Sequence, residues 1–204
     1  MDDSYTYDEK SKSFKPIDEK EGSGEGLGEI VKFALIAIVI VLPIRLFIAQ
    51  PFIVSGTSMD PTFESGEYII VDELSYRFND PKRGDVVIFK FPEDMTKYFI
   101  KRIIGLPGET VIVSENSVTI KNDEDPDGVA LEEPYLGSVG GTGTTITLGD
   151  DEYFVMGDNR RDSYDSRYWG AMPREDVVGR AFMRLLPVRK IDYLPGAFLL
   201  DEQK

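Results

Sequence analysis

Three short apolar stretches decide the fold of this chain: EYIIVDEL (67–74), DVVIFKF (85–91) and YFIKRIIG (98–105). Each is rich in Val, Ile, Tyr and Phe and is bounded by turn-forming residues, a pattern typical of β-strands. Runs of the same kind follow at ETVIVSE (109–115), SVTIK (117–121), TTITL (144–148), EYFVMG (152–157) and VVGRAFMRLLP (177–187). No ten-residue amphipathic helix separates them. The spacing therefore predicts a mainly β fold, an antiparallel β-sandwich or barrel-like domain over residues 51–204.

The stretch at about 122–144 interrupts this pattern. It is rich in Gly, Asp and Pro, and turn-forming residues of this kind are typical of exposed connections. We predict an exposed loop or small hairpin insertion within the β-domain.

A long apolar run precedes the first of these strands. From Ile30 to Val54 the only charged residues are Lys32 and Arg45, and such a length is sufficient to cross a bilayer. We therefore predict one N-terminal transmembrane helix over 30–50. Two alternatives remain: a cleaved signal peptide, which the long acidic tail argues against, and a buried helix of a soluble domain.

The residues before this run are highly charged. Residues 1–29 hold nine acidic side chains and four lysines, and low hydrophobicity with high charge predicts a disordered acidic tail. Five lysines, including Lys32, precede the centre of the run, whereas the first basic residue after Arg45 is Arg77. The positive-inside rule then predicts a single-pass protein of the cell membrane, with a cytoplasmic N-terminus and an extracytoplasmic C-terminal domain.

Composition excludes several kinds of chemistry. The 204 residues include no cysteine and no histidine, which rules out disulfides, thiol nucleophiles and Ser–His–Asp triads. Zinc sites built on Cys or His are excluded too, and we expect no metal or other cofactor. The net charge of −14 makes nucleic acid an unsuitable partner, because phosphate binding needs a basic face.

Two motifs carry candidate catalytic groups. SGTSMDPTF (55–63) follows the apolar run and places Ser58 between the turn-forming Gly56 and Pro61. In YFIKRIIGLPGE (98–109), Lys101 lies within an apolar strand. Such a lysine is either a charged gatekeeper of a sheet edge or a buried amine. A buried amine would have a lowered pKa and could deprotonate a serine where no histidine exists.

The third motif, GDNRRDSYDSRYWG (157–170), concentrates polar groups in two turn-prone stretches. It is interpreted either as a hydrogen-bonded network that supports a site or as a solvated loop capped by Trp169.

These motifs, together with RGDVVIF (83–89) and in this order after a membrane span, resemble those of type I signal peptidases, bacterial membrane-anchored Ser–Lys proteases of the S26 family. The likeness covers roughly residues 30–190. The short segment between the lysine and GDNR motifs is more similar to the compact enzymes of Gram-positive bacteria. The histidine-dependent subclass is excluded by the absence of histidine.

The resemblance implies a role for each matching residue. Ser58 would be the nucleophile and Lys101 the general base, and Ser163 would hydrogen-bond the lysine. Asp165 and Arg167 would form a structural ion pair within a network that also includes Asp158, Asn159 and Arg160. Gly56 stands where some members have an oxyanion-hole serine. The Ser58 N–H would then be one oxyanion donor, and the Gly56 region or a water the second.

The same resemblance implies the substrate. Secreted preproteins would bind by strand addition, with small residues selected at positions −1 and −3. By position we expect the pocket walls, or an apolar rim on the lipid, to come from six residues: Phe52, Val54, Met59, Phe63, Phe99 and Ile100.

Three other functions remain possible from the sequence. A self-cleaving repressor-like Ser–Lys protease would be soluble and would usually carry a DNA-binding module. A non-catalytic membrane-anchored homologue that assists the assembly of secreted or pilus proteins would typically lack the serine or the lysine. An inactive tethered β-sandwich would leave the motifs without an explanation.

Overall fold

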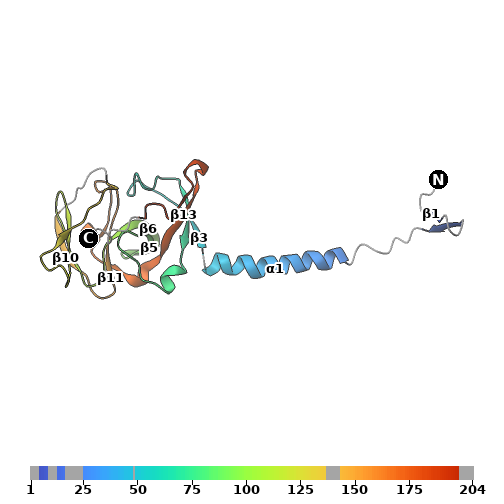
Figure 1. The fold of residues 1–204 in the computed structure, drawn as a ribbon, viewed down its shortest axis with the longest axis horizontal. Coiled ribbons are helices and arrows are strands. Elements are labelled where there is room, and N and C mark those ends of the chain that lie inside the picture. The colour runs from blue at the N-terminus through green and yellow to red at the C-terminus, as the bar shows by residue number, and fades with distance from the viewer. Residues whose placement is uncertain (1–4, 9–12, 17–24, 48, 137–142, 198–204) are drawn as a thin grey trace. The chain divides into compact units, whose positions relative to one another are not determined.

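The computed structural model describes residues 5–8, 13–16, 25–47, 49–136 and 143–197 (Figure 1). The chain divides into two units, Met1–Ile44 and Arg45–Lys204. In the first, β1 (Tyr5–Asp8) and β2 (Ser13–Pro16) pair antiparallel. These two strands lie within residues 1–29, for which composition predicts a disordered acidic tail; residues 1–4, 9–12 and 17–24 of it are outside the described residues. The strands hold Tyr, Thr and Phe, which favour extended backbone even in a charged segment.

The helix α1 (Glu25–Phe47) covers most of the predicted span 30–50. All side chains described in it, those of residues 28–39, are exposed. No helix in the described part of the chain has the length and hydropathy of a membrane span. The end of the predicted span differs, since β3 (Ala49–Ile53) begins two residues after Phe47 and pairs with the next strand. Pro51 fits there because an edge strand tolerates a residue without an N–H.

One large antiparallel sheet dominates the second unit. Its order is β12-β11-β6-β5-β13-β4-β3, and β14 pairs with β13. Besides β3, its strands are β4 (Tyr68–Asp72), β5 (Val86–Phe91), β6 (Asp94–Gly105), β11 (Glu152–Met156), β12 (Met172–Pro173), β13 (Val177–Leu186) and β14 (Asp192–Tyr193). The predicted mainly β, antiparallel fold is confirmed.

A smaller sheet of order β10-β7-β8-β9 lies at the end of this unit opposite β3 (Figure 1). It comprises β7 (Thr110–Val113), β8 (Val118–Lys121), β9 (Val129–Ala130) and β10 (Thr144–Thr147). The strand β9 lies within the predicted insertion 122–144, of which residues 137–142 are outside the described residues. One short α-helix, α2 (Ser166–Trp169), and three 3-10 turns, η1 (Ser75–Arg77), η2 (Arg174–Asp176) and η3 (Val188–Lys190), complete the unit.

The alternation of buried and partly exposed side chains along the strands shows which face contacts the core. In β4 every second residue is buried, as expected for a strand with one face on the core. One apolar cluster joins β4 and β5 to the loop after β3, and another joins the small sheet to Ile104 and Phe154 of the large one. Ile100 of β6 packs against the first cluster and Ile104 belongs to the second, so both clusters fix the position of the strand that carries Lys101.

Two open strand edges lie near Ser58. β3 pairs only with β4, and β6 pairs with β11 only from Arg102 onward, so that residues 98–101 have β5 as their single neighbour. Open edges of this kind can accept an additional strand.

Candidate active site

Ser58 lies on a tight turn directly after β3. The turn is closed by hydrogen bonds from Asp60 N to Thr57 O (3.1 Å) and from Phe63 N to Met59 O (2.9 Å). Met59 and Phe63, which were expected to line the substrate pocket, are buried in the core instead, at 1% and 0% exposure. Their burial follows from the turn, which directs both side chains inward, and it anchors the loop that presents Ser58.

Lys101 faces this serine from β6. Its Nζ donates hydrogen bonds to Ser58 Oγ at 2.7 Å and to the Ile100 carbonyl at 3.0 Å. The side chain is only 4% exposed, and its amine lies 5.3 Å from the centre of the Phe99 ring. Of the two alternatives for Lys101, edge gatekeeper and buried amine, the structure therefore has the buried amine.

Burial also changes the proton affinity of this amine. Desolvation lowers the pKa of Lys101 to about 8, while the carboxylates of Asp165 and Asp158 oppose the change. Near pH 7 a fraction on the order of one tenth of the lysine is then neutral. A neutral amine within hydrogen-bond distance of a hydroxyl can act as a general base toward it.

The segment after β11 holds the turn that carries the serine. Asn159 N donates to the Ser58 carbonyl at 3.0 Å, and Asn159 Nδ2 donates to the Thr57 carbonyl at 3.1 Å. The Thr57 hydroxyl donates in turn to the Asp162 carboxylate. These three bonds fix the backbone on both sides of the Thr57–Ser58 peptide.

Asp165 and Arg167 form the ion pair that the resemblance implies. Arg167 Nε lies 2.7 Å from Asp165 Oδ1, and both side chains are almost fully buried. Asp165 also accepts a bond from Gly157 N at 3.0 Å and from Arg167 N at 3.3 Å, which caps the start of α2. Of the two interpretations of 157–170, the network describes the segment better than the solvated loop.

Two further buried ion pairs support the segment. Asp158 binds Arg102 through Nε (2.8 Å) and Nη2 (2.6 Å), and Arg160 binds Glu133 through two bonds, one of 2.8 Å. Sequence reasoning missed Arg102 and Glu133. A charge within an apolar strand was the available signal for Arg102. Glu133 lies in the predicted exposed insertion, which is wrong at this position because Arg160 requires a buried counter-charge.

The surroundings of Ser163 and Gly56 differ from those that the resemblance implies for these two supporting residues. Ser163 Oγ is buried without a hydrogen-bond partner among the described residues, so the implied bond to the lysine is not formed. Lys101 Nζ is directed to Ser58 Oγ and the Ile100 carbonyl instead. Gly56 has a φ of 96°, which favours glycine, and its N–H donates to Ser65 Oγ at 3.4 Å.

A groove of about 450 Å³ opens beside the Ser58–Lys101 pair. Of the expected pocket residues, Phe52, Val54, Phe99 and Ile100 line it, together with Ser58 and Lys101 themselves. Its remaining lining, which sequence reasoning did not assign, is Ile53, Ser55, Ile69, Ile88, Lys97, Tyr98 and Tyr164. The groove is thus bounded by the two unpaired strand edges and is largely apolar.

The site offers no obvious ligand set for a metal ion. Within the part of the chain that the structure describes, no three Asp or Glu side chains are grouped in a way that could hold one. The chemistry available at the groove is that of the hydroxyl and the amine.

Comparison with known proteins assigns the family. The model of "Signal peptidase, peptidase S26" matches residues 27–186. A probable signal peptidase I-2 of Synechocystis sp. is 39% identical over 173 residues, which are 81% of this chain and 76% of that protein. Signal peptidase I of Bacillus licheniformis is 37% identical over 177 residues, 81% of this chain and 91% of that one.

A crystal structure of a signal peptidase I from Enterococcus faecalis V583 is also similar, with 32% identity and a TM-score of 0.43, covering 50% of this chain and 97% of that one. From the family match and the two relatives, the chain belongs to the S26 family of signal peptidases, serine endopeptidases that remove signal peptides from secreted preproteins.

Proposed function

We propose that the chain cleaves preproteins through a Ser58–Lys101 dyad. The observation that carries the proposal is the 2.7 Å hydrogen bond between Lys101 Nζ and Ser58 Oγ. The lysine is buried and its pKa is lowered to about 8, so the amine is available as a base close to neutral pH.

The mechanism follows from this pair. Neutral Lys101 accepts the hydroxyl proton as Ser58 Oγ attacks the scissile carbonyl carbon. Lys101 then returns the proton to the leaving amine as the C–N bond breaks, which releases the mature protein. Water, deprotonated by Lys101, hydrolyses the acyl-enzyme and frees the signal peptide. The Ser58 N–H is the first oxyanion donor, and the Gly56 region or a water supplies the second.

Supporting residues hold the dyad. An ideal Cβ on Gly157 would lie 2.3 Å from both Ser163 Oγ and the Ser58 carbonyl, so Ser163 is adjacent to the nucleophile. We assign its unpartnered hydroxyl to Lys101 during turnover, when the lysine releases Ser58. The ion pair of Asp165 with Arg167 keeps this segment in place.

Substrates would bind as an added strand. The open edges of β3 and β6 bound the groove, and an extended peptide between them would find backbone partners on both sides. Apolar residues line most of the groove, among them Phe52, Val54 and Ile100. Small side chains at positions −1 and −3 would fit beneath such a strand.

We further propose that the apolar run over residues 30–50, of which α1 covers the part up to Phe47, anchors the enzyme in the cell membrane, with the N-terminus cytoplasmic and the β-domain outside. The support is the apolar run from Ile30 to Val54 with two charges, the lysines that precede it, and the exposure of its apolar side chains such as Phe33 (70%) and Val39 (69%). Alkaline carbonate extraction and protease protection of intact cells test it. Release of the chain by carbonate, or digestion of its N-terminus from outside, would contradict the anchor or its orientation.

The catalytic proposal is tested by cleavage of a detergent-solubilised preprotein with an Ala-X-Ala site. Ser58→Ala and Lys101→Met should each lose at least about a thousandfold of kcat while retaining the wild-type circular dichroism spectrum. Ser117→Ala and Lys82→Met, distant residues of the same types, are the matched controls and should cleave normally. Retained cleavage by Lys101→Met would overturn the dyad. Cleavage elsewhere than after the second Ala would overturn the assigned specificity.

A further inference from the structure

A second hollow lies on the other side of Ser58. It has a volume of about 470 Å³ and is bounded by Thr57, Arg161, Asp162, Ser163, Tyr164 and Tyr168. It shares Ser58 and Tyr164 with the substrate groove, so the two depressions meet at the proposed nucleophile. Neither the family match nor the relatives assign a ligand to it.

A peptide whose scissile bond lies at Ser58 would extend into both depressions, one on each side of that bond. The groove extends from Ser58 along Phe52–Val54 and Lys97–Lys101, toward the beginnings of β3 and of the open edge of β6. The second hollow lies past the end of β3, beside the turn of Ser58 and the start of α2. If the acyl side of the scissile bond occupies the groove, as proposed above, the leaving side continues into the second hollow.

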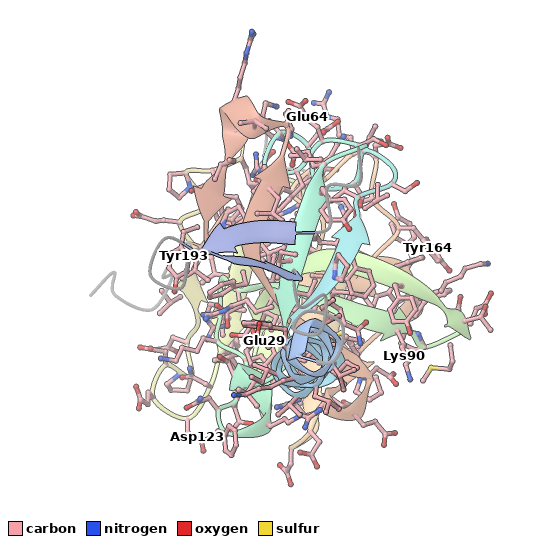
Figure 2. All side chains as sticks on the ribbon, turned by 90° about the vertical axis from the view of Figure 1, so that its right-hand side faces the viewer. Glu29, Glu64, Lys90, Asp123, Tyr164 and Tyr193 are labelled. Atoms are coloured by element: carbon pink, nitrogen blue, oxygen red, sulfur yellow. The ribbon has the colours of Figure 1, made fainter. Side chains whose placement is uncertain are left out.

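Two exposed aromatic rings form one wall of the hollow. Tyr164 and Tyr168 are 49% and 56% exposed, and their rings stack with centroids 5.6 Å apart at 29°. Figure 2 shows Tyr164 at the outer edge of the β-domain, with Tyr193 on the opposite side of the view. Exposed stacked rings offer a rigid surface on which a peptide can pack at low entropic cost.

Some polar groups of the hollow have hydrogen-bond partners within the protein, and others have none among the described residues. The Asp162 carboxylate already accepts the Thr57 hydroxyl. The side chain of Arg161, exposed at the rim, has no ion-pair or hydrogen-bond partner among the described residues. Ser163 Oγ, buried and also without a partner there, lines the same hollow. Since the Ser163 hydroxyl is assigned above to Lys101, the group left for a ligand is the Arg161 guanidinium next to an aromatic wall.

We propose that this hollow is the subsite for the first residues of the mature protein, with Tyr164 and Tyr168 as the packing surface and Arg161 as the partner of an acidic side chain at position +1 or +2. This inference rests on the proposed cleavage reaction and adds to it a specificity on the leaving side of the scissile bond.

Matched preprotein peptides test the charge preference. They share one Ala-X-Ala site and carry Ala, Glu or Lys at positions +1 and +2, and kcat/KM is measured for each. Wild type should cleave the Glu peptide about two- to fivefold better than the Lys peptide, with the difference reduced in high salt. Arg161→Gln should abolish this ratio and Arg161→Glu should invert it. Arg189→Gln, an exposed arginine of η3, is the control and should keep the wild-type ratio.

The aromatic wall is tested with a second pair of variants. Tyr168→Ala should raise KM several-fold for a peptide extended to position +4, and should leave unchanged a peptide whose leaving group is a small fluorogenic amine. Tyr193→Ala, which removes the exposed ring of the Phe182–Tyr193 pair, is the control. A Glu-to-Lys ratio that Arg161→Glu does not alter, or an equal effect of Tyr168→Ala on both peptides, would overturn the subsite. Failure of wild type to cut any peptide would instead overturn the proposed dyad function.

Discussion

Arg102 and Asp158 face each other in a doubly hydrogen-bonded pair at the centre of the β-domain. Arg102 Nε and Nη2 lie 2.8 and 2.6 Å from the two carboxylate oxygens, and the side chains are 1% and 0% exposed. Arg102 follows Lys101 on β6, and Asp158 precedes Asn159, which holds the Ser58 turn. The pair thus connects the strand that carries Lys101 to the segment that holds the Ser58 turn.

Removal of one partner of this pair should be strongly destabilising. Asp158→Asn leaves the buried Arg102 guanidinium without a counter-charge, and we expect a loss of about 3–5 kcal/mol in the free energy of unfolding. Urea denaturation at pH 7 measures it. The exposed pair Asp94–Lys97 is the control, and Asp94→Asn should leave the urea midpoint in place. A midpoint for Asp158→Asn equal to that of wild type would contradict a structural role for the pair.

The fold was predictable where strands have a clear pattern and clear ends. The runs at 67–74, 85–91 and 98–105 are strands in the structure because β-branched and aromatic residues alternate between turn signals. The predicted helix covers 30–50, whereas α1 ends at Phe47 and β3 begins at Ala49, since an apolar run does not distinguish a helix end from a following strand. Pairing with β4 decides that boundary at Ala49.

The site was predictable only in part, for a related reason. The order of the motifs along the chain identified Ser58 and Lys101 as candidate residues, and in the structure their side chains form a hydrogen bond. The partners Arg160 and Glu133 are 27 residues apart, and nothing local to Glu133 indicates its burial. Met59 was misplaced because an apolar residue beside a nucleophile has the same sequence signal whether it faces substrate or core. Only the direction of the turn separates the two cases.

The pH dependence of cleavage should report Lys101. The general base must be neutral, and burial lowers the pKa of Lys101 to about 8. We therefore expect kcat/KM to rise as pH increases through about 8, and to fall nearly tenfold for each pH unit below about 7. Initial rates between pH 5.5 and 9.5 at constant ionic strength provide the measurement. A level profile across this range would exclude Lys101 as the base.

The same lysine should destabilise the fold near neutral pH. Burial penalises its ammonium in the folded chain, whereas the unfolded chain keeps it in water with a pKa of 10.5. Lys101→Met should therefore raise the free energy of unfolding by about 1–3 kcal/mol at pH 7. Between about pH 8 and 10.5 the folded lysine is neutral while the unfolded one is still protonated, so wild type gains stability and the advantage of the variant shrinks.

Urea titrations of both proteins at pH 7 and pH 10 check this effect. Lys82→Met, at an exposed position, controls for the loss of one positive charge. If Lys101→Met is less stable than wild type at pH 7, the packing of the lysine stem outweighs the desolvation of its amine.

Gly157 should be required for activity more than for folding. A Cβ at this position would lie 2.3 Å from the Ser58 carbonyl and 2.3 Å from Ser163 Oγ. The Ser58 carbonyl belongs to the backbone, so Gly157→Ala must displace the turn that carries Ser58. A displacement of about 1 Å can reduce the rate on the order of a hundredfold, while overpacking of this kind costs about 1–3 kcal/mol in stability.

The comparison that isolates this effect is Gly149→Ala, whose Cβ would meet only the end of the Glu152 side chain, at 3.3 Å. Both variants are assayed for kcat, KM and thermal unfolding with the same Ala-X-Ala substrate. We expect Gly157→Ala to lose kcat with little change in KM, since the groove walls at Phe52 and Phe99 are untouched, and Gly149→Ala to resemble wild type. A Gly157→Ala enzyme with normal kcat would show that the Ser58 turn tolerates displacement, and that the contact between Asn159 and this turn does not set the geometry of attack.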